Sequence, residues 1–301
     1  MSLFNKLVVK SLPFIPKPVV GQVSKRYIAG ASLSDAIRTI KDLHAKSCMA
    51  TLDLLGEDIS TKDEAESTRE NVLQMYSAIA AERLNSNVSI KPTQFGLRID
   101  KQLCYRNIRV IARRAKELNN FLRIDMEDAT TTDDTLKMYH RLRSEGFENV
   151  GVVIQAYLFR SEADIRELVK TKANIRLCKG IYVESPSIAI KDRQGIRDNF
   201  MKLLRLALEG ESYAGIATHD EYLVEQSYQC LRELKLSPKQ YEFQMLLGVR
   251  EDLRSKIVAD GHRLRVYVPY GERWYAYSIR RLKENPAMAG YIVKAMFGMK
   301  S

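Results

Sequence analysis

The sequence predicts an α/β fold, a (βα)8 barrel of the TIM type with a C-terminal helix over the barrel mouth. Eight short β-rich runs alternate with amphipathic helical stretches along the 301 residues. The chain is 45% hydrophobic, which is enough for a large core, and no Gly-, Ser- or Pro-rich stretch divides it. Eight strand-then-helix units in one domain favour a closed parallel barrel. An open doubly wound sheet is the alternative, because strand counts read from one sequence err by about one or two.

The elements follow from local composition. Strands are expected where β-branched and apolar residues cluster, and helices where apolar residues recur at helical spacing. Thr132-Asp133-Asp134 and Ser161-Glu162 place oxygen acceptors and negative charge at two helix starts. In chain order, the expected strands are Cys48–Leu55, Val88–Lys91, Phe121–Asp125, Val150–Ala156, Asn174–Lys179, Gly215–His219, Glu242–Leu246 and Arg265–Val268. The expected helices are Asp63–Leu84, Lys101–Asn119, Thr132–Glu145, Ser161–Thr171, Arg193–Glu209, Glu221–Lys235, Arg250–Ala259 and Glu272–Phe297.

Residues 1–30 are expected to form a basic and apolar N-terminal arm, and residues 31–301 the barrel. No acidic residue precedes Asp35, and the arm has neither a continuous apolar segment nor an Ala-x-Ala site, which argues against secretion. Three interpretations of the arm stay open: an organellar transit peptide, an amphipathic segment on anionic lipid, and a lead-in that packs on the barrel. The basic residues of the arm are Lys6, Lys10, Lys17, Lys25 and Arg26.

The rest of the composition indicates a cytoplasmic protein. No apolar run approaches the roughly 20 residues that span a bilayer. Four widely spaced cysteines without a Cys-x-x-Cys pair indicate reduced thiols and argue against structural zinc. The basic arm leaves room for peripheral contact with the inner face of a membrane. The cysteines are Cys48, Cys104, Cys178 and Cys230.

The net charge of +11 raises a non-enzymatic alternative, a basic nucleic-acid-binding protein. Arg106, Arg109, Arg113 and Lys116 form a stripe at helical spacing. A solvated outer helix of the barrel explains the stripe better, and no aromatic residues are interleaved to stack on bases. We therefore expect no nucleic-acid partner.

Polar residues gather where the expected strands end, which is where a barrel of this type carries its function. The sequence has no Gly-x-Gly-x-x-Gly turn, Walker loop, Gly-x-Ser-x-Gly elbow or His-Glu-x-x-His helix. A rim of Lys, Asp, Gln, Arg, His and Tyr remains, and it suits an anionic cofactor and a carboxylate substrate. The strand-end residues are Glu57, Lys91, Asp125, Gln155, Arg176, Thr218, His219 and Tyr267.

Seven blocks, in order and at similar spacing, resemble the proline dehydrogenase family. The resemblance extends from about Ala29 to Phe297. It implies an FAD-dependent barrel that oxidises L-proline to 1-pyrroline-5-carboxylate by hydride transfer, with electrons passed to a membrane quinone. Another flavin-dependent barrel oxidoreductase, acting on a different secondary amine or on a folate, is the nearest alternative. The blocks are Ser89–Leu97, Arg123–Glu127, Val153–Tyr157, Arg176–Tyr182, Ala217–His219, Tyr241–Leu246 and Arg280–Asn285.

The resemblance implies a substrate site. Arg280 and Arg281 would grip the substrate carboxylate, because guanidinium groups match a carboxylate in two-point geometry. Tyr277 and Glu284 lie on nearby faces of the same expected helix. The resemblance adds Lys91, Leu246 and Tyr267 to the substrate site, and implies catalytic roles for Lys91, Asp125, Arg176 and Tyr267. On adjacent strands, Lys91 and Asp125 are expected to hold each other's orientation.

The resemblance also implies a cofactor site and a gate. Gln155 and Arg176 correspond to residues at the flavin ring, where amide and cationic groups favour the arrival of negative charge. Glu57 would pair with Arg280 and close the mouth over the substrate. No metal is implied, since His219 has no partner histidines at ligand spacing. The remaining cofactor residues are Lys179, Gly180, Tyr182, Thr218 and His219.

Two residues depart from the family pattern. Asp220 stands where Asn commonly follows Thr-His, and it is expected to add negative charge near the cofactor phosphates. Ile181 replaces a smaller residue before Tyr182, and it is expected to crowd the cofactor. Both departures concern the affinity for FAD rather than its identity.

Overall fold

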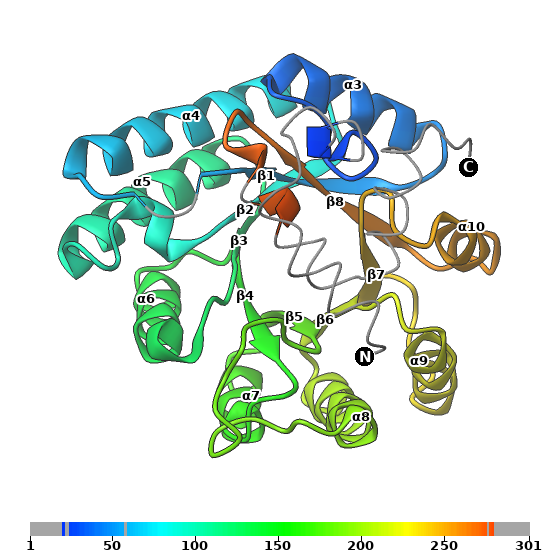
Figure 1. Ribbon diagram of the computed structural model, residues 1–301. Helices are drawn as coiled ribbons and strands as arrows, with labels where there is room; N and C mark the ends of the chain where they lie inside the picture. The colour runs from blue at the N-terminus through cyan, green and yellow to red at the C-terminus, as the bar shows by residue number, and fades with distance from the viewer. Residues whose placement is uncertain (1–19, 22–23, 57–58, 276, 280–301) are drawn as a thin grey trace.

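The computed structural model describes residues 20–21, 24–56, 59–275 and 277–279. In this part of the chain, eight strands pair in chain order and parallel, and β8 pairs with β1 to close the barrel (Figure 1). The predicted barrel is therefore confirmed over the open sheet. The strands are β1 Met49–Leu54, β2 Ser86–Ile90, β3 Leu122–Ile124, β4 Val150–Gln155, β5 Asn174–Cys178, β6 Tyr213–Ala217, β7 Tyr241–Leu246 and β8 Leu264–Tyr270.

Seven of the eight expected helices surround the barrel with ends close to those predicted. The last expected helix lies mostly outside the described residues, although residues 274–275 and 277–279 are helical. The helices are α4 Lys62–Ala81, α5 Lys101–Glu117, α6 Thr132–Ser144, α7 Ser161–Val169, α8 Arg193–Glu209, α9 Glu221–Glu233 and α10 Glu251–Ala259, with short 3-10 turns η2 Pro92–Phe95 and η3 Ala129–Thr131.

A further helix, α3 Leu33–His44, precedes β1 and was not predicted. Ser32 and Asp35 form a capping box at its start, which satisfies backbone N–H groups that the first turn leaves without partners. Ala36, Ile40 and Leu43 recur at helical spacing and are buried. The helix packs on β1 and β8, so it covers the seam where the barrel closes.

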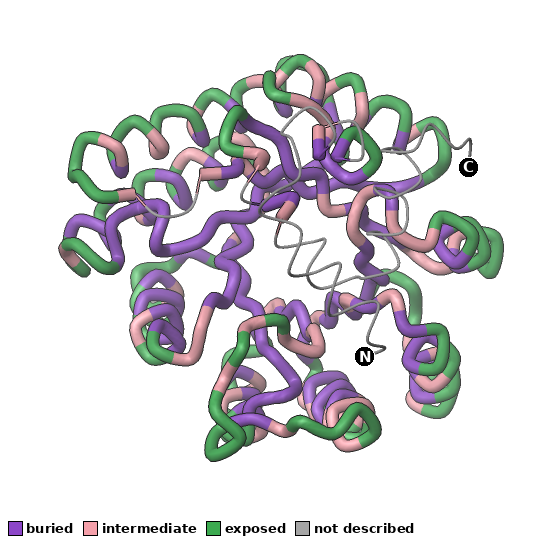
Figure 2. Tube along the Cα trace, viewed as in Figure 1, coloured by how far each residue is buried: buried purple, intermediate pink, exposed green. Residues whose placement is uncertain are grey.

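The hydrophobic core lies between the strands and the ring of helices, where the inward faces of the helices are buried (Figure 2). Successive strand residues point to opposite sides of the sheet. One side therefore carries apolar residues toward the helices. These outward residues include Leu52, Val88, Ile90, Ile124, Val152, Ile154, Ile175, Leu177, Ile216, Phe243 and Val266.

The other side of the strands faces the barrel lumen and is polar, although barrel interiors of this type are commonly filled by branched apolar residues. Arg176 on β5 contacts side chains from β2, β7 and the end of β3, which requires all of them to point inward. We call this set of hydrogen-bonded inward side chains the lumen network. It includes Asp53, Ser89, Lys91, Asp125, Arg176, Tyr213, Glu242, Gln244, Arg265 and Tyr267.

The described end of the N-terminal arm packs on the barrel. Ala29 donates its backbone N–H to the carbonyl of Pro269 at 2.9 Å, and the hydroxyl of Ser24 donates to that of Ser278 at 2.7 Å. Tyr27 and Ile28 pack with apolar residues at the mouth. These contacts belong to the last residues of the arm, and residues 1–19 and 22–23 lie outside the description. Among the helices that the structure describes, none combines the length and apolar character needed to cross a membrane.

Candidate active site at the carboxyl ends of the strands

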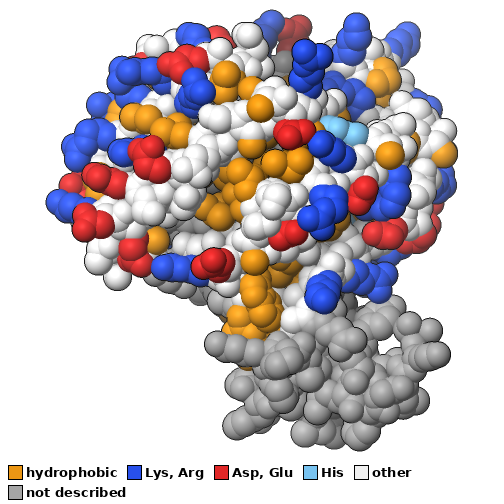
Figure 3. All heavy atoms as spheres, turned by 90° about the horizontal axis from the view of Figure 1, so that it is seen from above, with side chains coloured by type: hydrophobic (Ala, Val, Ile, Leu, Met, Phe, Trp, Pro, Cys, Tyr) orange, Lys and Arg blue, Asp and Glu red, His pale blue; other side chains and the backbone are white. Residues whose placement is uncertain are grey.

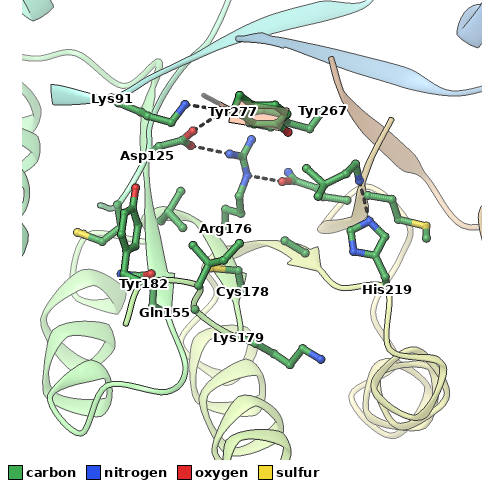
Figure 4. A pocket seen from close by; sticks show the side chains of 18 residues that line it. Lys91, Asp125, Gln155, Arg176, Cys178, Lys179, Tyr182, His219, Tyr267 and Tyr277 are labelled. Carbon is green, nitrogen blue, oxygen red and sulfur yellow. Dashed lines mark hydrogen bonds and ion pairs between the residues drawn. The ribbon is translucent and has the colours of Figure 1, made fainter. Parts of the chain in front are cut away.

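A hollow of about 250 Å³ opens at the carboxyl ends of the strands (Figure 4). Its walls come from β2 to β8 and from Tyr277 at the start of the last helix. The hollow brings together residues that the sequence places far apart. The predicted residues that line it are Lys91, Asp125, Gln155, Arg176, Lys179, Gly180, Tyr182, His219, Leu246, Tyr267 and Tyr277.

Lys91 forms a buried ion pair with Asp53 of β1. Lys91 Nζ lies 3.0 Å from Oδ1 and 3.1 Å from Oδ2 of Asp53, and this carboxylate has no exposed surface. Asp53 is thus a carboxylate that contacts Lys91 directly within the described part of the chain. In the barrel register, Asp53 lies beside Ser89, two residues before Lys91, so the side chain of Asp53 reaches the ammonium group from the neighbouring strand β1.

Tyr267 connects Lys91 and Asp125, the two charged groups that the sequence analysis expected to hold each other's orientation. Its hydroxyl accepts a hydrogen bond from Lys91 Nζ at 3.2 Å and donates one to Asp125 Oδ2 at 2.9 Å. Burial, with Asp125 and Asp53 nearby, raises the pKa of Tyr267 well above its ordinary value. The phenol therefore stays protonated at neutral pH and keeps its proton for Asp125.

The guanidinium of Arg176 is held on three sides inside the lumen, and Figure 4 shows its contact with Asp125. Nη1 donates to Asp125 Oδ1 at 2.6 Å, and Nη2 donates to the hydroxyl of Ser89 at 3.1 Å. Nε donates to Oε1 of Gln244. Because a guanidinium is planar, three partners in different directions leave it one orientation.

The loop after β5 passes close to Tyr157 through Gly180. Gly180 has φ +105°, and a Cβ atom there would lie 2.1 Å from Cδ1 of Tyr157. Only glycine meets both constraints. Gln155, on β4, donates its side-chain amide to the carbonyl of Glu127 at 2.9 Å, which fixes it at the wall of the hollow. Ile181 lies at the edge of the hollow and is 40% exposed.

His219 supports the wall opposite. Its Nε2 accepts a hydrogen bond from the backbone N–H of Leu246 at 2.8 Å, so the neutral ring carries its proton on Nδ1. This bond holds the backbone of Leu246, whose side chain lines the hollow. Within the described ranges, no three His, Cys, Asp or Glu side chains gather as a metal site.

A second hollow of about 450 Å³ adjoins the first and shares Lys179, Ala217 and His219 with it. Thr218 lies here rather than in the first hollow, and its hydroxyl accepts the backbone N–H of Asp220 at 3.1 Å. The basic residues that line this second hollow are Lys179, Arg193, Arg197 and Arg250.

Asp220 organises the cations of the second hollow. Arg197 donates Nη2 to Oδ1 of Asp220 at 2.7 Å and Nε to Oδ2 at 2.9 Å, and Lys179 Nζ lies 3.2 Å from Oδ2. Burial alone would raise the pKa of Asp220, but Arg197 and Lys179 outweigh it and lower the pKa to about 2. The sequence predicted only an added negative charge; in the structure this charge orients two cations.

Four predicted residues lie outside the described part of the chain: Glu57, Arg280, Arg281 and Glu284. The gate and the paired arginines therefore remain predictions.

The site also contains residues that the sequence analysis did not identify. Asp53, Ser89 and Gln244 bind the predicted charged groups directly. A signal existed, because polar residues at every second position of a buried strand mark an inward polar face. Other unpredicted lining residues are Met126, Val153, Cys178, Ala217 and Met245.

Comparisons with known proteins agree on one family. A family model described as Proline dehydrogenase matches residues 36–294. Proline dehydrogenase 1 of Bacillus subtilis (strain 168) is 38% identical over 273 residues, which cover 91% of this chain and 90% of that protein. Proline dehydrogenase of Deinococcus radiodurans is 36% identical over 278 residues, with 91% and 90% covered.

Solved structures share the fold. Proline utilization A (PutA) from Bdellovibrio bacteriovorus, inactivated by N-propargylglycine, aligns with a TM-score of 0.86 at 24% identity. The alignment covers 99% of this chain and 38% of that longer one. A mutant PutA from Bradyrhizobium japonicum aligns with a TM-score of 0.76 at 20% identity and is covered to 32% of its length.

Proposed function

The chain belongs to the proline dehydrogenase family, and on that premise we propose that it oxidises L-proline to 1-pyrroline-5-carboxylate with FAD as cofactor. The observation that carries the proposal is the arrangement of Lys91, Tyr267, Asp125 and Arg176 around one hollow. The hydrogen bonds between these residues link Lys91, which we assign to the substrate carboxylate, to Arg176, which we assign to the flavin.

The substrate end of the hollow suits an amino acid with a carboxylate and an apolar ring. The ammonium group of Lys91 stays near the hollow because Asp53 holds it, and it can attract the carboxylate of proline. The side chain of Leu246 and the ring of Tyr277 can contact the proline ring. We assign the other carboxylate contacts to Arg280 and Arg281, with Glu284 as their support.

The residues of the two hollows fit FAD. A flavin is planar and a dinucleotide carries two phosphates, so the cofactor needs an apolar slot joined to a cationic one. The first hollow has Met126 and Val153 in its wall, and the second has Arg193 and Arg197. Lys179 borders both. We also assign cofactor contacts to Gln155, Arg176, Gly180, Tyr182, Thr218 and His219.

FAD, when bound, would supply the acceptor for the hydride of the ring carbon beside the proline nitrogen, so that a C=N bond could form as the nitrogen loses its proton. The protein's part is to orient and polarise. Arg176 offers a guanidinium whose direction is fixed before the reaction, so no reorganisation is needed when negative charge arrives. Apolar walls keep water away from the reacting bond.

We propose a quinone as the acceptor of the two electrons, by family resemblance. Long-chain quinones dissolve in lipid, so the proposal includes contact with the inner face of a membrane. Sedimentation with vesicles of phosphatidylglycerol and phosphatidylcholine would test this contact. Binding to the anionic vesicles supports it, and recovery of the whole protein in the supernatant contradicts it.

The central experiment is a flavin spectrum of the purified protein, followed anaerobically with L-proline. We expect the absorbance of the oxidised flavin to bleach with L-proline and to persist with D-proline. Bleaching by another secondary amine or by a folate, but not by proline, would favour the nearest alternative. A protein that takes up no flavin contradicts the proposal. A suitable pair of variants is Lys91→Met, which should raise KM for proline, and the exposed control Lys101→Met, which should not.

The nucleic-acid alternative finds no supporting observation in the described residues. Arg109 pairs with Glu145 at 2.5 Å, and Lys116 Nζ donates to the carbonyl of Gly146 at 3.1 Å, so half of the basic stripe contacts the end of α6. On the face over α3 and α4, basic and acidic side chains are interspersed (Figure 3).

A further inference from the structure

Arg176 depends on a neighbouring side chain that also lines the first hollow. Gln244 of β7 is 6% exposed and accepts the Nε–H of Arg176 through its Oε1 atom. Its Nε2 atom donates to Oε1 of Glu242 at 2.6 Å. The amide of Gln244 therefore links Arg176 to the carboxylate of Glu242. Among the described residues, no hydrogen bond joins Arg176 and Glu242 directly.

Glu242 fixes which end of this amide faces Arg176. Glu242 is 3% exposed, and it accepts hydrogen bonds from Arg265 at 2.7 and 3.0 Å and from the hydroxyl of Tyr213 at 2.9 Å. Burial alone would raise the pKa of Glu242, but Arg265 outweighs it and the pKa falls to about 2. An ionised carboxylate accepts hydrogen bonds and cannot donate them, so the NH₂ group of Gln244 must face it.

The reversed amide is excluded electrostatically. Turned by 180°, Gln244 would point its carbonyl oxygen at the carboxylate of Glu242 and its NH₂ group at the guanidinium of Arg176. Both contacts would then be repulsive in a buried, low-dielectric setting. Only one orientation gives two hydrogen bonds.

The barrel provides a space for this amide. Gly215 of β6 is in register with Arg176 on one side and with Glu242 on the other. A Cβ atom on Gly215 would lie 2.6 Å from Nε2 and 3.0 Å from Cδ of Gln244. The amide of Gln244 therefore occupies the volume that any other side chain at position 215 would fill.

We propose that Gln244 is a positioning residue for Arg176, oriented by Glu242 and admitted by Gly215, and that it sets the electrostatic preference of the site for reduced flavin. The inference rests on the proposed function and goes beyond it. Gln244 acts through Arg176: without the amide, Nε of Arg176 loses its partner and the guanidinium can rotate away from the flavin end of the hollow.

Two variants test this from opposite sides. Gln244→Met keeps the length of the side chain and removes both hydrogen bonds; Gly215→Ala leaves Gln244 unchanged and displaces its amide. The matched controls are Gln229→Met, which removes an exposed amide that donates to Glu233 at 2.9 Å, and Gly195→Ala, which adds a close contact in α8.

The decisive measurement is the midpoint potential of the bound flavin, with the dissociation constant for FAD measured in parallel. We expect each test variant to shift the equilibrium about tenfold toward oxidised flavin, a fall of about 30 mV for a two-electron couple. Flavin reduction by proline should slow about tenfold with KM changed less than about twofold. In an Arg176→Lys background, Gln244→Met should add little, since both changes disable the same group. The controls should match the wild-type protein.

A purely structural role for Gln244 would lower thermal stability and leave the potential unchanged. Folded, flavin-loaded Gln244→Met or Gly215→Ala protein with the wild-type potential would overturn the inference and leave the proposed function intact. Wild-type protein that takes up no flavin, or takes up flavin that proline does not reduce, would overturn the proposed function and this inference with it.

Discussion

The ammonium group of Lys91 lies 3.0 Å from the carboxylate of Asp53, which is entirely buried. The ammonium group of Lys91 lies beside the hollow, and its counter-charge is Asp53 on the neighbouring strand β1. A buried ion pair is sensitive to the loss of one partner, because the other charge is then left without compensation.

Asp53→Asn should therefore destabilise the protein and weaken its hold on substrate. We expect the free energy of unfolding to fall by about 3 kcal/mol, the typical cost of removing one partner of a buried pair. The KM for proline should rise, because Lys91 loses the group that orients it. Urea denaturation and steady-state kinetics measure the two effects.

A second substitution separates these effects. In Asp53→Asn/Lys91→Met both charges are gone, so stability should largely return while KM stays high. The exposed Asp63→Asn variant is the control and should behave like the wild-type protein. A double variant no more stable than the single one would show that the ion pair is not the source of the loss.

Tyr267→Phe tests the hydroxyl that links Lys91 to Asp125. The ring remains and two hydrogen bonds are lost. We expect kcat/KM for proline to fall about tenfold, since the ends of both charged side chains gain freedom. Tyr105→Phe, which removes a hydroxyl that donates to Glu145 at 2.6 Å between the outer helices, should leave kcat/KM unchanged. Equal values for the two variants would remove Tyr267 from the proposed site.

Gly180→Ala should lower the stability of the protein by more than the strain of its backbone angle alone. Gly180 has φ +105° and a close approach to Tyr157, whereas Gly146 has φ +81° and nothing within 4 Å of an added Cβ atom. Gly146→Ala therefore measures the strain alone, about 1–2 kcal/mol. Gly180→Ala should cost more and should also weaken FAD binding, as thermal unfolding and flavin titration would reveal. Equal losses would mean that the contact with Tyr157 is easily relieved.

Asp220→Asn should change how the free energy of unfolding depends on pH. The pKa of Asp220 is lowered from 3.8 to about 2, so its contribution to stability is complete above pH 4 and is lost as the pH falls toward 2. The contribution is about 2 kcal/mol. At pH 7 the free energy of unfolding should be larger for the wild-type protein than for the variant, and this difference should vanish near pH 2. Urea unfolding at several pH values measures it, with the exposed Asp42→Asn as control. A difference independent of pH would contradict the role of the carboxylate charge.

The sequence predicted the barrel because apolar runs and helical periodicity are local signals that repeat along the chain. The strand ends were predictable for the same reason, since Lys91 and Asp125 each end such a run. Arg176 lies inside the fifth run, in the block that resembles the family. Helix α3 was missed although Ser32 and Asp35 form its capping box, because it precedes the first strand and lies outside the repeating unit.

The partners of the charged residues were not predictable in the same way. Asp53 and Gln244 lie inside strands, where most neighbours are apolar, and their contacts join residues 38 and 68 positions apart. Which cation meets which carboxylate depends on the barrel register, and one sequence does not specify that register. Lys91 illustrates this: both neighbours of β2 offer a carboxylate, and Lys91 binds Asp53 of β1 directly and reaches Asp125 through Tyr267.

The positions of the lumen ion pairs along the chain decide where the barrel can be cut into two fragments without separating a pair. Asp53 and Lys91 belong to β1 and β2, Asp125 and Arg176 to β3 and β5, and Glu242 and Arg265 to β7 and β8. A nick between β2 and β3 leaves every pair within a single fragment. A nick at the midpoint, between β4 and β5, separates Asp125 from Arg176 and sends opposite uncompensated charges into the two halves. Fragments made by a cut between β2 and β3 should thus reassemble into a working enzyme more readily than fragments made by a cut between β4 and β5.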